Sequence, residues 1–185
     1  MVIDRERFPW LFEAPRRAPT RAERETAVRW TAGLQTAQEV QTKRRGESAA
    51  RQEQAIERML AALGFAKVAP RPINVTGGLS PGEFCRESNV VRVKCDIPVG
   101  LRDGRFLFVE CKVSNSATNS VKRLNRETGG KASVWRREFG NRAIAAAVLA
   151  GVFKLRNLKD AQDAGVTIFW ERDLGALAEF LKVAV

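Results

Sequence analysis

The chain has 185 residues with 44% hydrophobic content, enough to bury one sizeable core. It contains no His and no Tyr, which excludes an imidazole base, a His metal ligand and a Tyr nucleophile, and leaves carboxylate, lysine and metal chemistry. The formal net charge of +11 is typical of proteins with a phosphate-rich partner or, less specifically, an acidic membrane surface.

Residues 1–46 are predicted to form an N-terminal arm and a helix. Prolines interrupt the first 19 residues, and Thr20 with Glu23 fits a capping box at the start of the helix. An apolar stripe then recurs at helical spacing to about Arg44, formed by Ala27, Trp30, Leu34 and Ala37. We expect this helix to pack or dimerise, and "KRRG" at 43–46 to break it.

Residues 47–185 are predicted to form one α/β domain. A helix from Ser48 to Gly64 precedes a short strand in "AKVAPRPINV", a Gly/Pro/Ser-rich loop at 76–82, and the strands "VVRVKCDIPVGL" and "RFLFVECKVS". Helices are expected over 117–128, 131–139, 156–164 and from near Asp173. A strand is expected in the second half of "AIAAAVLAGVF", with a buried helix as the alternative that periodicity leaves open, and another strand at "VTIFW". This order indicates a mixed sheet with helices on both sides.

The strand at 105–114 is apolar on both faces except for two charged residues. Glu110 and Lys112 share a face with Phe106 and Phe108, because side chains alternate along a strand. Burying two charges costs several kcal/mol each, and a mutual pair only about breaks even against apolar residues. A divalent metal and a DNA phosphate would compensate for the buried charges, and a metal would require a second carboxylate beside Glu110.

Asp96 is the candidate second carboxylate, and its position depends on the hairpin register. A two-residue turn at 103–104 would point Asp96 away from Glu110, whereas a three-residue loop with Gly104 in the left-handed conformation would place the two opposite one another. A bulge near Pro98 would also correct the register. The competing interpretation puts Asp96 on a solvated face with neighbouring cations and leaves Glu110 paired with Lys112 at a rim.

The distribution of other residues adds three expectations. Residues 112–142 hold eight Lys or Arg against two Glu, which makes a basic segment directly after this strand. Cys85, Cys95 and Cys111 form no CxxC pair and are interpreted as reduced, buried thiols. No apolar run is long enough to cross a membrane and "MVIDRERFPW" has no signal-peptide core, so a cytoplasmic protein is expected.

Asp96 followed by Glu110, Cys111 and Lys112 resembles the PD-(D/E)xK nuclease signature, although Cys95 stands where that motif has proline. The resemblance narrows to XamI-type restriction endonucleases over about residues 20–180. The segments that carry it are "WTAGLQTAQEVQTKRR", "PGEFCRES", "ECKVSNSATNSVKRLN", "VLAGVFKL" and "VTIFWERDL". It implies the restriction-endonuclease-like α/β fold and a Mg²⁺-dependent, sequence-specific cut of double-stranded DNA in phage defence.

The resemblance also implies roles for the site residues. Asp96 and Glu110 would bind Mg²⁺, for which Mn²⁺ could substitute, with the Cys111 carbonyl as a further ligand. Lys112 would act on the attacking water. Glu53 would be an auxiliary acidic residue that contacts the metal through water. The alternative is that Glu53 is an ordinary solvated carboxylate, because Glu57 occupies the neighbouring turn of the same helix. A homodimer matching a palindromic site is expected by analogy.

DNA contacts are expected from the polar segment after the strand, because Asn and Arg can read base edges and Lys contacts phosphate. The candidates are Asn115, Ser116, Asn119, Ser120, Lys122, Arg123 and Arg126, with helix capping as the alternative for the first two. Glu83 and Glu87 are either additional acidic site residues or structural. A less specific nuclease of the same fold and a non-catalytic DNA-binding protein stay open. The chain is short for the family, so a recognition element is expected to be missing or supplied by a partner.

Overall fold

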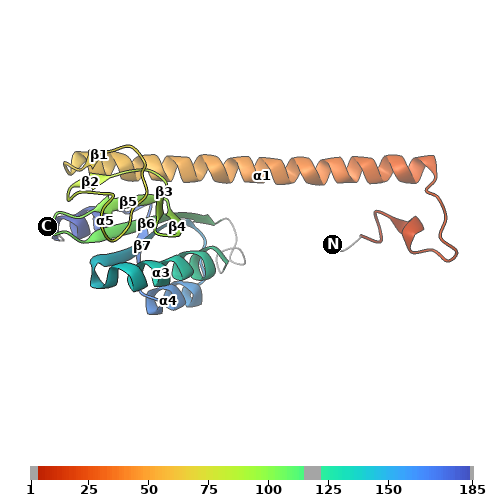
Figure 1. Ribbon diagram of the computed structural model, residues 1–185. Coiled ribbons are helices and arrows are strands. Elements are labelled where there is room, and N and C mark those ends of the chain that lie inside the picture. Colours follow the sequence, from red (N-terminus) through yellow and green to blue (C-terminus); the bar gives the residue numbers. More distant parts are fainter. Residues whose placement is uncertain (1–3, 115–121, 184–185) are drawn as a thin grey trace. The chain divides into compact units, whose positions relative to one another are not determined.

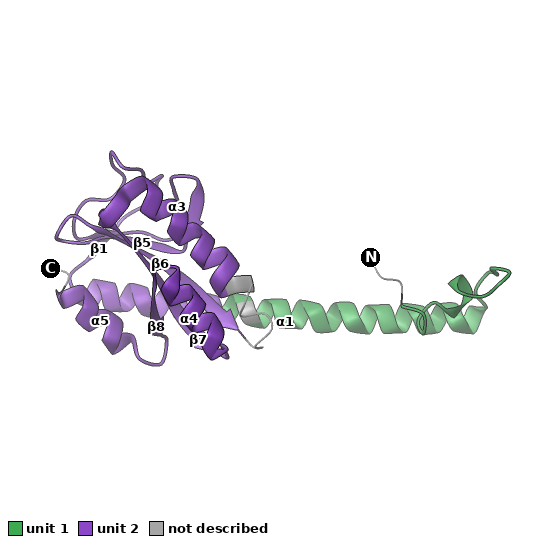
Figure 2. Cartoon of the chain, turned by 90° about the horizontal axis from the view of Figure 1, so that it is seen from below, with its two compact units in different colours: residues 1–47 green, residues 48–185 purple. Residues whose placement is uncertain are grey.

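The computed structural model describes residues 4–114 and 122–183, which divide into two compact units, 1–47 and 48–185 (Figure 2). Within the described ranges the elements follow in this order: η1 (Pro9–Leu11), α1 (Arg21–Ala62), β1 (Ala66–Lys67), β2 (Glu83–Phe84), β3 (Ser88–Val90), β4 (Val93–Cys95), β5 (Ile97–Gly100), β6 (Phe106–Ser114), η2 (Lys122–Gly129), α3 (Gly130–Phe139), η3 (Gly140–Arg142), β7 (Ala143–Gly151), α4 (Leu155–Asp163), β8 (Val166–Trp170) and α5 (Leu174–Val183). None of the helices in these ranges is long and apolar enough to cross a membrane.

Helix α1 runs without interruption through the segment at which a break was predicted. Its 42 residues include "KRRG", so the prediction of two helices was wrong. Lys and Arg are good helix formers, and a glycine inside a helix costs only about 1 kcal/mol, which is too little to end a helix that contains no proline. The predicted capping box is confirmed: the Glu23 carboxylate accepts a hydrogen bond from Thr20 N at 2.8 Å, and Glu23 N donates to Thr20 Oγ1 at 3.3 Å.

Unit 1 buries little of its predicted apolar stripe. Ala27 is buried and Trp10 from η1 is 9% exposed, whereas Trp30 and Leu34 are 52% and 53% exposed. Phe8 and Trp10 contact edge to face with ring centroids 5.6 Å apart. A small aromatic cluster around η1 and the first turns of α1 therefore gives this unit its packing, rather than the full stripe.

Unit 2 is built on a mixed six-stranded sheet, as the predicted fold class requires. The strand order is β1-β2-β5-β6-β7-β8, with β6, β7 and β8 parallel to one another and β5 antiparallel to β6. The strands β3 and β4 form a separate hairpin. All nine residues of β6 are buried, which makes it the central strand.

Two of the predicted strands are shorter than expected. In "AKVAPRPINV" only Ala66–Lys67 pairs as a strand, because Pro70 and Pro72 lack the N–H that a ladder needs. In "VVRVKCDIPVGL" the chain turns back at Val91, which has φ of 59°, so that Val90 pairs with Val93. The run therefore splits into β3, β4 and β5, although it looked like one strand by composition.

Helices cover both faces of the sheet in unit 2 (Figure 1). On one face, Leu107 and Val109 of β6 join Ile56 and Leu60 of α1 in a core that α5 completes. On the other face, Phe108 packs on Trp135 of α3 with ring centroids 5.0 Å apart, and α4 covers the neighbouring strands. The predicted alternation along β6 is confirmed, and it places Glu110 and Lys112 on the α3 face.

Candidate metal-dependent nuclease site

The turn between β5 and β6 decides whether the two predicted carboxylates meet. Leu101 N donates to Arg105 O at 2.8 Å around a three-residue loop, and Gly104 has φ of +84°, the left-handed conformation that this loop requires. Ile97 then pairs with Val109 without an intervening bulge. Asp96, the next residue, consequently lies across from Glu110, so the register expected for a metal site is confirmed.

Asp96 sits at the junction where the chain leaves β4 and enters β5. Its Oδ2 accepts a hydrogen bond from the backbone N–H of Cys111 at 2.7 Å and lies 3.4 Å from Lys112 Nζ. Its side chain is only 19% exposed. These contacts contradict the interpretation in which Asp96 joins a solvated face, since its carboxylate turns toward β6.

Glu110 is completely buried, and two lysine ammonium groups neutralise it. Lys112 Nζ lies 2.7 Å from Glu110 Oε2, while Lys131 Nζ lies 2.8 Å from Oε1 and 2.7 Å from Oε2. Lys131 belongs to the first turn of α3, and its side chain is 22% exposed. Lys131 was missed in the sequence because nothing in its spacing shows that α3 brings its side chain to Glu110 of β6.

Lys112 connects the two carboxylates through a single ammonium group. Burial alone would lower the pKa of Lys112, but the charges of Glu110 and Asp96 outweigh burial and raise this pKa to about 12. Lys112 is therefore protonated at neutral pH in the arrangement described. The expected pair with Glu110 exists, but it lies inside the protein rather than at a solvated rim.

Glu53 approaches this site from α1, on the other side of the sheet. Its side chain is partly buried, and in the next turn of α1 Ile56 packs into the core between α1 and the sheet. Burial raises the pKa of Glu53, and the nearby negative charge of Asp96 raises it further, while Arg86 acts in the opposite direction. The structure thus brings Glu53 into the field of Asp96, although no described hydrogen bond joins Glu53 to another group.

The other acidic residues near the site are held by cations. Glu57 forms ion pairs with Arg86 and with Lys67, the latter at 2.6 Å, and is almost fully buried. Burial alone would raise the pKa of Glu57, but these hydrogen bonds lower it. Glu83 pairs with Arg71 at 2.6 Å and Glu87 with Lys94 at 2.7 Å. For both of these residues the structural interpretation is the one supported.

The oxygen atoms around Asp96 fit a hard divalent cation. Asp96 and Glu110 supply carboxylates joined through one ammonium, so they lie close together. The Cys111 N–H donates to Asp96, and the N–H and C=O of one residue in an extended strand point to the same side, which makes the Cys111 carbonyl the candidate backbone ligand. Among the described residues no three Asp, Glu, Cys or His side chains form a metal-binding cluster, so water would have to complete the coordination of Mg²⁺.

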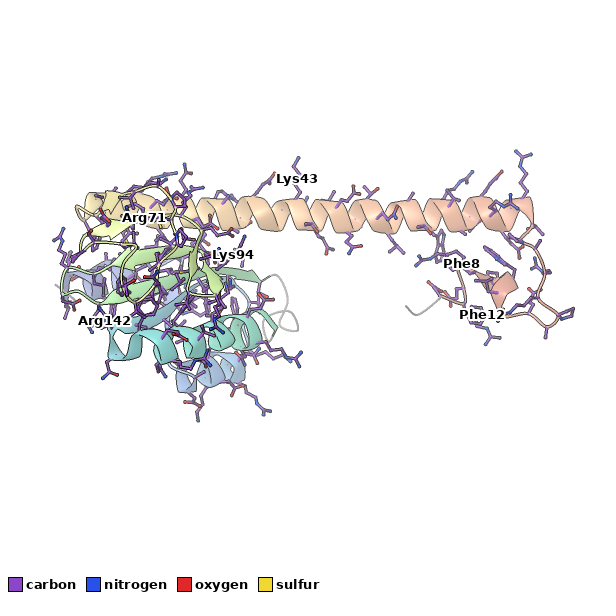
Figure 3. All side chains as sticks on the ribbon, viewed as in Figure 1. Phe8, Phe12, Lys43, Arg71, Lys94 and Arg142 are labelled. Carbon is purple, nitrogen blue, oxygen red and sulfur yellow. The ribbon has the colours of Figure 1, made fainter. Side chains whose placement is uncertain are left out.

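The predicted DNA contacts are placed only in part. Asn115, Ser116, Asn119 and Ser120 lie outside the described residues, and the backbone of Lys122 and Arg123 begins η2. Arg126 of η2 is exposed. Elsewhere on unit 2, Arg71, Lys94 and Arg142 are exposed basic residues (Figure 3).

The three cysteines take no part in this cluster through their thiols. Cys85, Cys95 and Cys111 are buried and unpaired, as predicted. Burial raises the pKa of the Cys95 and Cys111 thiols well above the usual value, and the neighbouring carboxylates add to that effect. A thiol that does not ionise is a poor nucleophile, so Cys95 and Cys111 act as small core side chains.

Comparison with known proteins places this chain in a family. A family model described as "XamI restriction endonuclease" matches residues 1–170. The chain belongs to the XamI restriction endonuclease family. It is 40% identical over 144 residues to the Type II restriction enzyme XamI of Xanthomonas campestris pv. amaranthicola, an alignment that covers 77% of this chain and 52% of that protein. The chain therefore spans about half the length of its curated XamI relative.

Among solved structures, protein VC1899 from Vibrio cholerae matches 55% of this chain and 28% of its own length, with a TM-score of 0.42 and 15% identity. That likeness is too weak to bear on the fold or the site. The match to the XamI family model includes Asp96, Glu110 and Lys112, all within residues 1–170.

Proposed function

We propose that this chain carries the catalytic centre of a metal-dependent, sequence-specific endonuclease that hydrolyses phosphodiester bonds in double-stranded DNA. The observation that supports it most is the link through Lys112, whose ammonium lies 2.7 Å from Glu110 and 3.4 Å from Asp96. The ammonium of Lys112 thus connects two residues of β6 with Asp96, which lies between β4 and β5. Membership of the XamI restriction endonuclease family gives that cluster its expected chemistry.

Asp96, Glu110 and the Cys111 carbonyl would hold Mg²⁺, or Mn²⁺ in its place. The bound cation would neutralise charge on the scissile phosphate and lower the pKa of a water molecule. The Cys111 N–H fixes Asp96 Oδ2 by a 2.7 Å hydrogen bond, so this carboxylate is oriented before any ligand arrives. The burial of Glu110 keeps bulk water from competing for its oxygens.

Lys112 places a positive charge between the two carboxylates. As a protonated group it can donate hydrogen bonds to the attacking water or to a phosphate oxygen, which orients the one and draws charge from the other. It cannot accept a proton while both neighbouring carboxylates retain their full negative charge. A role for Lys112 as a base would require that negative charge to be neutralised first.

Glu53 would support the site at longer range through the Asp96 side. Burial raises the pKa of Glu53 and the nearby Asp96 charge raises it further, which is the environment expected of an auxiliary acidic residue. On the DNA side, Asn119, Lys122 and Arg126 are proposed contacts, with Asn115, Ser116, Ser120 and Arg123 as further candidates. A homodimer reading a palindromic site is proposed from the symmetry of such sites.

The test is incubation of the purified protein with a large mixed-sequence DNA in Mg²⁺, beside EDTA and Lys112→Ala controls, followed by electrophoresis. Discrete bands that vanish in both controls are the expected result. A metal-dependent smear would show that the protein cuts DNA without sequence specificity, as a general nuclease does. Intact DNA of retarded mobility would refute catalysis by this chain and favour a binding protein, or one that needs a further segment or partner.

The proposed DNA contacts have their own measurement. Binding titrations in Ca²⁺ with Asn119→Ala, Lys122→Ala and Arg126→Ala should show weakened affinity, because each variant loses a group able to contact base or phosphate. Unchanged affinity in all three variants would reject the assignment of this segment to DNA.

A further inference from the structure

Lys131 of α3 makes a contact with the site that neither the motif nor the family membership assigns. Its ammonium reaches both oxygens of Glu110, at 2.8 and 2.7 Å, whereas Lys112 reaches only Oε2. No other described ion pair involves a carboxylate that is completely buried and held by two lysines. The two ammonium groups balance the charges of Asp96 and Glu110 when no metal is bound.

The contact is not explained by helix capping. The backbone at Gly129 is already helical, with φ of −61° and ψ of −39°, so η2 runs directly into α3. Lys131 therefore has no exposed helix end to cap, and a lysine at the beginning of a helix gains nothing from the helix dipole. Its interaction with Glu110 must be understood from the site itself.

A lysine on both oxygens of a carboxylate occupies the positions that a chelated cation would use. A carboxylate can accept several hydrogen bonds, so Lys112 on one oxygen leaves room for a further ligand. Lys131 lies against both oxygens of Glu110, and its positive charge repels a divalent cation that approaches them. Its four-carbon side chain can withdraw without movement of α3, and its partial exposure gives it a route toward solvent.

We propose that Lys131 is a placeholder cation that holds Glu110 in the metal-free protein and is displaced when a divalent cation binds. This inference rests on the proposed function, because it concerns the same site. In the metal-free state Lys131 keeps a buried carboxylate neutralised. The cation must then displace Lys131, which weakens apparent metal affinity and couples metal binding to the release of one lysine.

The first test is Mn²⁺ affinity measured by calorimetry on the full chain without DNA, comparing Lys131→Met with the wild-type protein. Methionine keeps much of the side-chain volume and removes the competing charge. We expect Mn²⁺ to bind roughly tenfold more tightly, the equivalent of one charge-assisted hydrogen bond that no longer has to be broken. Unchanged or weaker binding by the folded variant would overturn the proposal, as would the absence of Mn²⁺ binding in both proteins.

Arg137→Met is the matched control for this measurement. Arg137 lies on the same helix and carries the same charge, but its side chain is 68% exposed and pairs at the surface with Glu138. This control should leave Mn²⁺ affinity within about twofold of wild type, since exposed charges are strongly screened. An equal gain in both variants would show that net charge alone is responsible and would overturn the placeholder role.

The second test needs no variant. Acetylation of the wild-type protein followed by peptide mass spectrometry should show Lys131 modified several times faster when Mn²⁺ is present, because its amine has left Glu110. Lys182 of α5, which is 56% exposed and pairs with Glu179, should react at the same rate with and without Mn²⁺. Lys131 reactivity that stays constant or falls at saturating Mn²⁺ would refute the displacement.

These measurements separate this inference from the proposed function. If the protein cuts DNA in Mg²⁺ but Lys131→Met binds Mn²⁺ with the same affinity as the wild type, only the placeholder role is overturned. Tighter Mn²⁺ binding by Lys131→Met in a protein that cuts no DNA would overturn only the endonuclease proposal.

Discussion

Replacement of Glu110 by glutamine tests how much the buried ion pairs of Glu110 with Lys112 and Lys131 contribute to the free energy of unfolding. Glutamine has nearly the same shape, so the change removes a negative charge without opening a cavity. It leaves the ammonium groups of Lys112 and Lys131, with side chains 11% and 22% exposed, without their shared partner. Removal of one member of a buried ion pair costs about 3–5 kcal/mol, and residual solvent access with the Asp96 contact reduces this to about 2–3 kcal/mol.

The assay is urea unfolding at pH 7 followed by circular dichroism. Glu179→Gln is the matched control, because Glu179 also accepts a lysine hydrogen bond at 2.7 Å but its side chain is 69% exposed. We expect the control to lose less than about 0.5 kcal/mol of unfolding free energy. If Glu110→Gln loses no more than Glu179→Gln, the buried cluster contributes little and the reasoning is refuted. Cleavage by Glu110→Gln should be abolished under conditions in which it remains folded.

Three further predictions follow from contacts around the site. Lys112→Ala should reduce cleavage in Mg²⁺ by at least about 100-fold in a single-turnover assay while Ca²⁺-dependent DNA binding persists, and near-normal cleavage would remove it from catalysis. Glu57→Gln should lower the unfolding free energy at pH 7 by about 1–2 kcal/mol, because two cations are lost as partners. Ion pairing lowers the folded-state pKa of Glu57 below the usual 4.5, so its stabilisation is present above that pH and is lost as pH falls through the folded-state value. The difference in urea midpoint between the wild type and Glu57→Gln should therefore shrink in acid. A difference that does not change with pH would contradict the ion pairs of Glu57. Gly151→Ala should lower the melting temperature by several degrees, since its Cβ would lie 2.1 Å from the Ser114 carbonyl oxygen at φ of +94°, and an unchanged midpoint would contradict that close approach.

Local patterns in the sequence were sufficient for the central strand. Its uniform apolar character predicted burial on both faces, and its alternation separated Phe108 and Glu110 from Val109 and Cys111. The loop with Gly104 limited Asp96 to a small number of registers, one of which is observed. These properties depend on neighbouring residues and on backbone geometry, so they can be inferred without knowledge of the rest of the fold.

The sequence was a poor guide where stability depends on distant packing. Apolar composition could not separate β3, β4 and β5, because the positive φ at Val91 is tolerated only where the hairpin packs. The end of the first helix was predicted too early, since Gly46 weakens a helix without ending it.

The sequence by itself determined a buried strand with a glutamate and a lysine, a basic segment after it, and a chemistry without His or Tyr. Only the tertiary structure decided that Asp96 faces Glu110, that Glu53 approaches from the opposite side of the sheet, and that Lys131 closes the site. The physical reason is that charge compensation in a protein interior depends on distance in space. Residues from separate elements meet only after the sheet and its helices have packed.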